Sequence, residues 1–161
     1  MNLLSPSTHL LLVLLMPLVG AGTIWLISSR GLDAVRTSAA TTAVLTLIAT
    51  GWLILRYLMS GEASSNEVFA MVSLPWLTGG MFDIRLSIGL DGLSLWLFGL
   101  SALLSVTAIF VSWEAVTERV AGFYMLLLLL EAAMLGVFVA RDIILFYVFF
   151  EFTLVPLFFL I

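Results

Sequence analysis

RDIILFYVFFEFTLVPLFFLI, residues 141–161, is an apolar stretch with a carboxylate, Glu151, near its middle. About 20 mostly apolar residues are enough to cross a bilayer as a helix. An ionisable side chain at that depth costs roughly 3 kcal/mol or more, so its default interpretation is functional. Pro156 follows the acid and cannot donate a hydrogen bond to the carbonyl of Phe152. The stretch therefore predicts a membrane helix that bends just beyond a functional glutamate.

The composition of the whole chain is that of an integral membrane protein. Hydrophobic residues make up 63% of its 161 residues and charged residues only 10%, far outside the range of soluble domains. The chain has no cysteine and a single histidine, His9, so it offers neither disulfides nor a metal-ligand cluster. Its basic residues are six scattered arginines, which form no basic surface for nucleic acid. We therefore predict an all-α membrane protein that binds no metal and no nucleic acid.

Five apolar stretches are long enough to be membrane-spanning helices, at about residues 9–27, 39–59, 91–112, 121–140 and 143–161. Pro17 and Gly20 in the first predict a kink or close packing against a neighbouring helix. A secretory signal peptide is the competing interpretation of this stretch, but no basic residue precedes it. Without a low-complexity boundary, the five helices are expected to form a single membrane domain.

The connection between the second and third helices has the pattern of a short β-hairpin. Residues 82–88 alternate strictly between apolar and polar side chains, which is the period of a half-buried strand, and residues 78–80 supply a turn. We expect this hairpin to lie outside the membrane. Asp91 then fits the N-cap of the third helix, although Ser94 in place of glutamate argues against a full capping box.

A second acid, Glu131, lies inside the fourth apolar stretch. Small side chains recur every four residues beside it, at Ala132, Gly136 and Ala140, and such a stripe lets another helix approach closely. The fourth and fifth stretches are joined only by a tight turn at Arg141 and Asp142, which either pair with each other or cap the fifth helix.

The position of this turn predicts the depth of both acids. Glu131 precedes Arg141 by ten residues and Glu151 follows it by ten, so both carboxyls should lie roughly 15 Å from the turn. Helix rotation decides whether they face each other, and the sequence leaves this open. If they did, the two could not both ionise easily and would share one proton. Structural hydrogen bonding between helices is the alternative role, and it suits Glu131 better than Glu151, which is followed by Pro156.

Three segments together resemble a known family: GLDGLS at 89–94, ARD at 140–142 and FFEFTLVPLFFLI at 149–161. They are similar to the N-terminal part of the antiporter-like subunits of respiratory complex I, and the LVPL at 154–157 is most like subunit M. The resemblance implies that the chain is truncated at Ile161. It also implies proton transfer by Glu151, whose partner in the family is a lysine on a later helix. Proton transfer is also expected at Glu131, with structural support from Pro156, Asp142, Arg141 and Asp91.

The same resemblance implies a non-redox subunit of a proton-translocating NADH:quinone oxidoreductase that is not catalytic in isolation. No cofactor is expected in this chain, which lacks cysteine and a glycine-rich dinucleotide motif after a strand. NADH, flavin mononucleotide (FMN), iron–sulfur clusters and quinone are expected in partner subunits. The expected neighbours are other membrane subunits of complex I, including antiporter-like ones, and membrane lipid, in the plasma membrane of a bacterium.

Two other functions stay open at this point. The chain resembles the related subunit of multisubunit cation/proton antiporters as well, and the neighbouring genes would separate that function from complex I. A structural membrane scaffold is the third alternative. It requires that Glu131 and Glu151 only bond helices together, so glutamine should replace them without functional loss.

Overall fold

The structure is a computed structural model that describes residues 5–60, 69–78 and 83–161. Each of its long helices coincides with one of the five apolar stretches, and each is long and apolar enough to cross a membrane. The elements are α1 (Pro6–Ile27), the 3-10 turn η1 (Ser28–Arg30), α2 (Leu32–Ser60), β1 (Phe69–Thr78), β2 (Asp83–Leu90), α3 (Gly92–Ala115), α4 (Val120–Val139) and α5 (Ile143–Leu160). The predicted class, an all-α membrane protein with one β-hairpin between its second and third helices, is confirmed.

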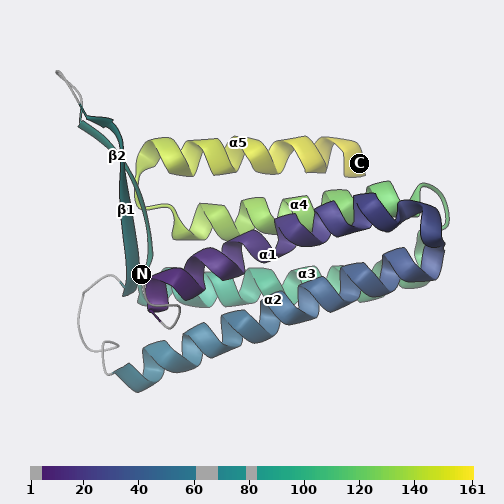
Figure 1. Ribbon diagram of the computed structural model, residues 1–161, viewed down its shortest axis with the longest axis horizontal. Helices are drawn as coiled ribbons and strands as arrows, with labels where there is room; N and C mark the ends of the chain where they lie inside the picture. The colour runs from purple at the N-terminus through teal and green to yellow at the C-terminus, as the bar shows by residue number, and fades with distance from the viewer. Residues whose placement is uncertain (1–4, 61–68, 79–82) are drawn as a thin grey trace.

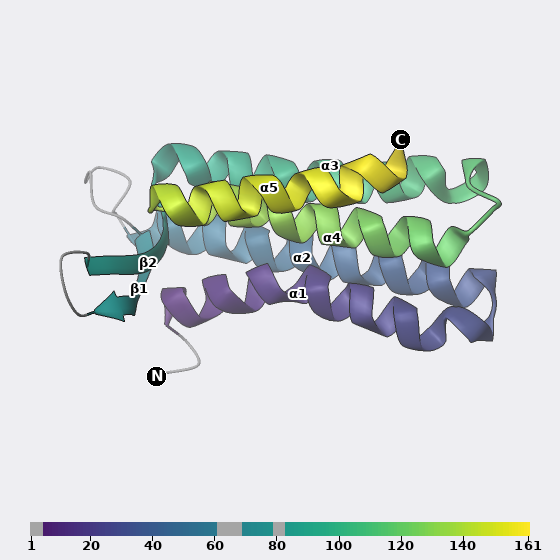
Figure 2. The same cartoon turned by 90° about the horizontal axis from the view of Figure 1, so that it is seen from above.

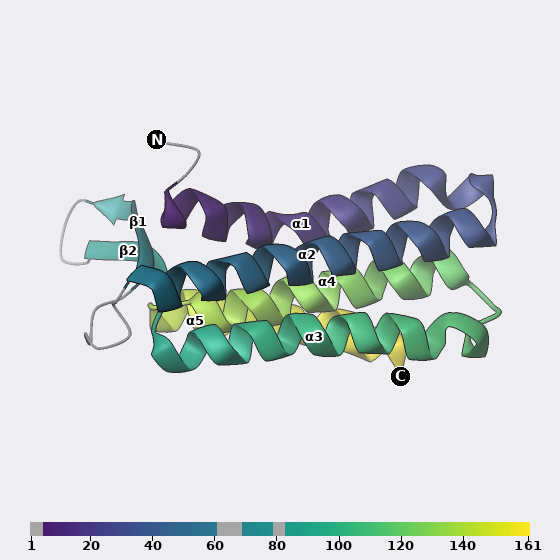
Figure 3. The same cartoon turned by 90° about the horizontal axis from the view of Figure 1, so that it is seen from below.

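The five helices lie side by side, each antiparallel to the one before it (Figure 1). Seen from above and from below, α4 lies inside the bundle and α5 covers one side of it (Figures 2 and 3). Indeed, α4 packs against each of the other four helices, whereas α5 packs mainly on α4. Pro156 is the one buried residue of α5, so nearly the whole surface of this apolar helix is left uncovered.

The first two helices are joined tightly because Gly31 adopts a φ of 116°, a conformation that favours glycine. Helix α2 begins at Leu32, seven residues before the expected start. Its first two turns are helical although they carry polar side chains, and the apolar stretch begins only after them. Gly20 gives α1 the close approach that the sequence predicted. A Cβ atom at this position would overlap the side chain of Thr42 on α2.

The hairpin caps one end of the bundle, across the ends of the helices (Figure 1). Its antiparallel register runs from the Phe69–Leu90 pair to the Thr78–Asp83 pair. Residues 79–82 lie outside the described residues. They include most of the predicted turn and the first residue of the predicted strand. The hairpin is attached to the α4–α5 turn through the Arg141 amide, which donates to the Ser87 carbonyl at 2.9 Å.

Two apolar clusters fill the bundle, one near each end. The cluster at the hairpin end includes Leu10, Phe98 and Leu135, and the cluster at the other end includes Ile24, Ile109 and Leu128. Buried polar side chains interrupt this interior at only a few described positions, among them Thr50, Ser101 and Glu131. These buried polar side chains are therefore the candidates for a functional role inside the bundle.

Candidate functional site: two carboxylates on adjacent helices

Glu131 is enclosed within the bundle. Its residue is 1% exposed, and neither carboxyl oxygen has a hydrogen-bond partner within the described part of the chain. It lies where α4 packs against α3, beside a cavity of about 150 Å³. The cavity also receives Ser101 and Ser105 from α3. A carboxyl group enclosed without a donor is uncommon, because most buried polar groups are hydrogen-bonded.

Glu151 has a different environment. It is exposed on α5, the outermost helix, where most of its neighbours are exposed phenylalanines and aliphatic side chains. Tyr147 lies one turn earlier on the same helix, where its hydroxyl is close enough to interact electrostatically with the Glu151 carboxylate. An exposed acid in an otherwise apolar membrane helix calls for a partner outside the described bundle.

The two acids branch from adjacent antiparallel helices, each ten residues from the turn, but they do not form a pair. Glu131 lies between α3 and α4, whereas Glu151 lies on the exposed surface of α5. No hydrogen bond joins their carboxyl groups in the described structure. The rotation that the sequence left open therefore separates the two acids, and a proton shared directly between them has no structural support.

Helices α4 and α5 meet closely at Gly136. A Cβ atom on this glycine would overlap the aromatic ring of Phe149, so the small-residue stripe is needed at this point for helix contact. Ala132 is also buried on α4. Pro156 lies within α5, which continues through it as a helix to Leu160. The bend expected beyond Glu151 stays a prediction.

Charged residues form hydrogen bonds between the helix ends nearest the hairpin. Arg141 donates from Nη1 to Oδ2 of Asp91 at 2.7 Å. Asp142 instead caps α5, accepting from the amides of Ile144 and Leu145 at 3.1 and 3.3 Å. Pairing between Arg141 and Asp142, one of the two alternatives, is therefore wrong, since each has a different partner.

Asp91 occupies the N-cap of α3 and accepts from the Ser94 amide at 2.7 Å. The Ser94 hydroxyl in turn accepts from the Asp91 amide at 2.8 Å. The expectation of an incomplete capping box is thus wrong, because serine is long enough to make the reciprocal bond. The bonds from Ser94, with a further contribution from Arg141, lower the pKa of Asp91 from its ordinary 3.8 to about 2.

Sequence reasoning missed Ser101, Ser105 and Tyr147. The two serines are four residues apart, a spacing that places them on one side of a helix, but serines are common in membrane helices as packing residues. Only the three-dimensional packing of α3 against α4 brings them to the cavity beside Glu131.

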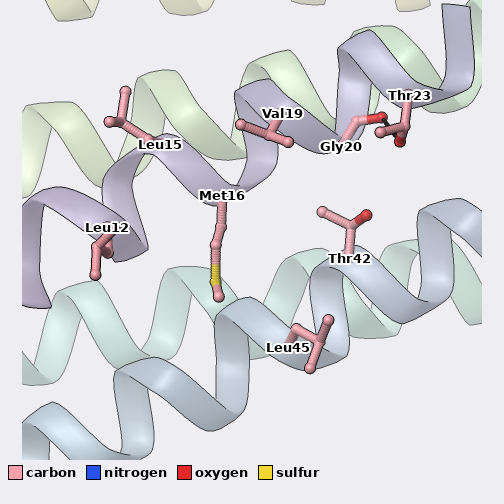
Figure 4. Close-up of a pocket in the computed structure, with 8 residues that line it drawn as sticks. All are labelled: Leu12, Leu15, Met16, Val19, Gly20, Thr23, Thr42 and Leu45. Atoms are coloured by element: carbon pink, nitrogen blue, oxygen red, sulfur yellow. Dashed lines mark hydrogen bonds between the residues drawn. The ribbon is translucent and has the colours of Figure 1, made fainter. Parts of the chain in front are cut away.

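A larger, apolar groove runs between α1 and α2 (Figure 4). It has a volume of about 400 Å³, and its lining includes Leu12, Met16 and Leu45. The close-up shows the two hydroxyl-bearing residues of this lining, Thr23 and Thr42, toward one end of the groove. No ionisable side chain lines it, so the groove offers none of the acid–base chemistry of Glu131 and Glu151.

No group of three or more metal-ligating side chains occurs among the described residues. The membrane-spanning helices α4 and α5 carry two carboxyl groups, of which Glu131 is enclosed and Glu151 is exposed. Five spanning helices with such groups define an integral membrane protein of the all-α class.

Comparison with known proteins identifies the kind of subunit. No family model matches the chain. It is 33% identical over 150 residues to F(420)H(2) dehydrogenase subunit M of Methanosarcina mazei, covering 93% of this chain and 29% of that protein. It is 32% identical over 151 residues to NADH-quinone oxidoreductase subunit M of Escherichia coli, covering 92% of this chain and 29% of that protein. With NADH-ubiquinone oxidoreductase chain 4 of Chondrus crispus it shares 30% identity over 152 residues, 94% of this chain and 30% of that protein.

A solved structure shares the fold. The chain aligns with a chain of the membrane-bound sulfane sulfur reductase, an archaeal respiratory membrane complex, with a TM-score of 0.60 and 19% identity. The alignment covers 91% of this chain and 22% of that one. The resemblance to the antiporter-like subunit M type of respiratory complexes is thus confirmed, and this chain spans less than a third of the length of these relatives.

Proposed function

We propose that this chain is part of a membrane subunit that moves protons across an energy-transducing membrane, within an NADH:quinone oxidoreductase. Glu151 and Glu131 carry the protons, and electron transfer in partner subunits drives the movement. The observation that carries this proposal is the presence of two carboxyl groups in adjacent membrane-spanning helices of a subunit M type chain. Ionisable groups at such positions are expensive and are typical of proton pathways.

The separation of the acids supports two proton-carrying steps in place of one shared proton. Glu131 is enclosed against α3, so a proton on it is shielded from both aqueous sides. Glu151 is exposed on α5, where a cationic side chain from outside this bundle can approach it. An opposite charge within about 5 Å favours the ionised form of a carboxyl group, so making and breaking such a pair would release and bind a proton.

The uncovered surface of α5 also supports a role as part of a larger assembly. Apart from Pro156, every residue of this helix is at least partly exposed, although the helix is apolar on all sides. We infer that further helices cover it and that they supply the lysine expected from the family. The chain then forms part of a single antiporter-like membrane domain, in contact with other membrane subunits and with lipid.

The redox chemistry belongs to partner subunits in this proposal. NADH, FMN, iron–sulfur clusters and quinone would bind there, and this chain would contribute no cofactor ligand. The named relatives act with different electron donors, F(420)H(2) in one case and NADH in another. This difference is consistent with a membrane subunit that leaves the choice of donor to its partners. The proposed location is the plasma membrane of a bacterium.

The test is proton uptake driven by NADH oxidation in sealed membrane vesicles, with Glu151→Gln in the full-length chain of an otherwise intact complex. Glutamine keeps the size and the hydrogen bonding of the side chain but cannot carry a proton. We expect proton uptake to fall clearly below the parent level in this variant while the complex assembles to the parent level. Unchanged uptake would instead support the scaffold function. Uptake that depends on sodium would favour the cation/proton antiporter.

A further inference from the structure

The groove between α1 and α2 is lined by leucine, methionine, valine and glycine, apart from two threonines (Figure 4). Both threonine hydroxyls are already bonded within their own helices. Thr23 donates to the Gly20 carbonyl at 2.7 Å, and Thr42 donates to the Ser38 carbonyl at 2.9 Å. No polar group of the lining therefore requires a polar occupant, and the groove suits a hydrocarbon.

Contacts between the two helices limit the groove toward both ends. At one end, Nε2 of His9 lies 3.2 Å from the carbonyl oxygen of Ala49. Toward the other, Gly20 packs so closely on Thr42 that a Cβ atom would overlap the threonine side chain. The lining covers residues 12–23 of α1, which is roughly 16 Å of helix. This length is close to one leaflet of a hydrocarbon core that is about 30 Å thick.

The volume of the groove, about 400 Å³, favours a lipid chain over a protein helix as its occupant. An α-helix about 10 Å across and about 16 Å long would occupy on the order of 1,200 Å³, about three times as much. A single acyl chain is far thinner and can follow a groove that is open along one side. Val19 and Leu45 line the groove and are 64% and 54% exposed, so it is open to lipid in the described bundle. A chain seated there gains dispersion contacts that an empty space would forfeit.

A cationic side chain lies beyond the groove, in line with its wall. The lining residues of α1 recur every three or four positions up to Thr23, and the same steps lead through Ile27 to Arg30. Arg30 is exposed and is the last residue of the first membrane-spanning segment. It has no hydrogen bond or ion pair among the described residues, whereas Arg36, at the same end of the bundle, donates to the Val116 carbonyl at 2.9 Å.

We propose that the groove between α1 and α2 binds one acyl chain of a membrane phospholipid whose phosphate group lies at Arg30. A phosphate is negatively charged and accepts hydrogen bonds from guanidinium N–H groups, so it complements this arginine. Asp33, an exposed acid in the first turn of α2, forms no ion pair with Arg30 and leaves it available. The inference does not depend on proton transfer by Glu131 or Glu151.

Photolabelling of the purified complex, with the full-length chain, tests both parts of the proposal. The probe is a phosphatidylcholine with a diazirine at the end of one acyl chain, added to the complex in dodecyl maltoside micelles. After irradiation, the masses of proteolytic peptides show which residues carry the lipid. Unlabelled phosphatidylcholine and diacylglycerol then compete with the probe, since they share the acyl chains and differ in the phosphate-containing headgroup.

Two pairs of variants locate the site. Leu45→Trp fills the groove, and Ile48→Trp is its matched control, because Ile48 lies on the same helix, is 63% exposed and does not line the groove. Arg30→Gln removes the cation and leaves the groove unchanged. Arg119→Gln is the control for charge, because Arg119 is an exposed arginine at the same end of the bundle, at the N-cap of α4. All four side chains are exposed, so we expect each variant to assemble.

We expect labelling of residues 12–16 to fall severalfold with Leu45→Trp and to stay at the parent level with Ile48→Trp. Phosphatidylcholine should compete better than diacylglycerol by about fivefold, and Arg30→Gln should remove this difference whereas the charge control should keep it. Labelling that survives Leu45→Trp would overturn the proposal, as would equal competition by the two lipids in the parent. Label found elsewhere on the complex but not in the groove would also overturn it, because another protein segment would then cover the groove.

Discussion

Arg141 and Asp91, fifty residues apart in the sequence, are joined by a hydrogen bond of 2.7 Å between Nη1 and Oδ2. The bond connects the α4–α5 turn to the N-cap of α3. It therefore holds together the ends of three helices, including the two that carry the membrane carboxylates. The side chains of Arg141 and Asp91 are 32% and 46% exposed, so solvent weakens the electrostatic part of this contact.

Substitutions at these two positions should differ in their effects. Arg141→Gln removes only an exposed ion pair, and we expect it to lower stability by less than about 1 kcal/mol. Asp91→Ala removes the helix cap as well, which adds about 1 kcal/mol. Thermal unfolding of the purified complex, followed on this chain, gives the order. Equal losses for the two variants would contradict the assignment of Asp91 as a cap.

The charge on Asp91 predicts a pH dependence. Its pKa in the folded chain is about 2, below its ordinary value of 3.8, so the ionised form stabilises the fold. This stabilisation is complete above about pH 4 and is lost as the pH falls toward 2. Asp91→Asn retains a good cap but no charge, so it should be less stable than the parent at pH 7. The difference should shrink between about pH 4 and pH 2, and a constant difference would contradict the cause given for the pKa.

The contact between Gly136 and Phe149 predicts a strong effect of one added methyl group. Gly136→Ala would drive its Cβ into the ring and should cost about 1–3 kcal/mol, with loss of α4–α5 contact. Gly122→Ala is the matched control on the same helix, because a Cβ there meets no atom within 4 Å. The amount of assembled complex and its melting temperature report both.

A second substitution separates this steric effect from helix propensity. Phe149→Leu in the Gly136→Ala chain removes the ring and should restore much of the lost stability. Failure of this rescue would show that the glycine is needed for another reason. The result bears on function because α5 has little other anchorage within the described bundle.

The sequence predicts the five helices well because a long apolar stretch has few stable alternatives in a membrane. The strand at 83–90 was detectable by its alternation, whereas β1 contains Pro75, which obscures a strand pattern. The early start of α2 was missed because Asp33 and Arg36 make its first turns look like a loop. Hydropathy detects only the apolar part of a helix, so it misses polar turns at the helix ends.

Side-chain direction was the part of the site that could not be predicted. Helices α4 and α5 are apolar on all sides, so their sequences contain no polar stripe that would fix their rotation. The shared depth of Glu131 and Glu151 follows from counting residues along antiparallel helices. Their separation follows only from how α3 packs on α4, which also brings Ser101 and Ser105 to Glu131.

The most direct test of the account counts the protons taken up per electron pair in sealed vesicles that contain the full complex. The parent is compared with Glu131→Gln, with Glu151→Gln and with the double variant, all at equal assembly. If each acid carries protons at its own site, both single variants should lower the ratio, and the double variant should abolish uptake. A parental ratio in the double variant would contradict the account, because neither carboxyl group would then be needed to move a proton.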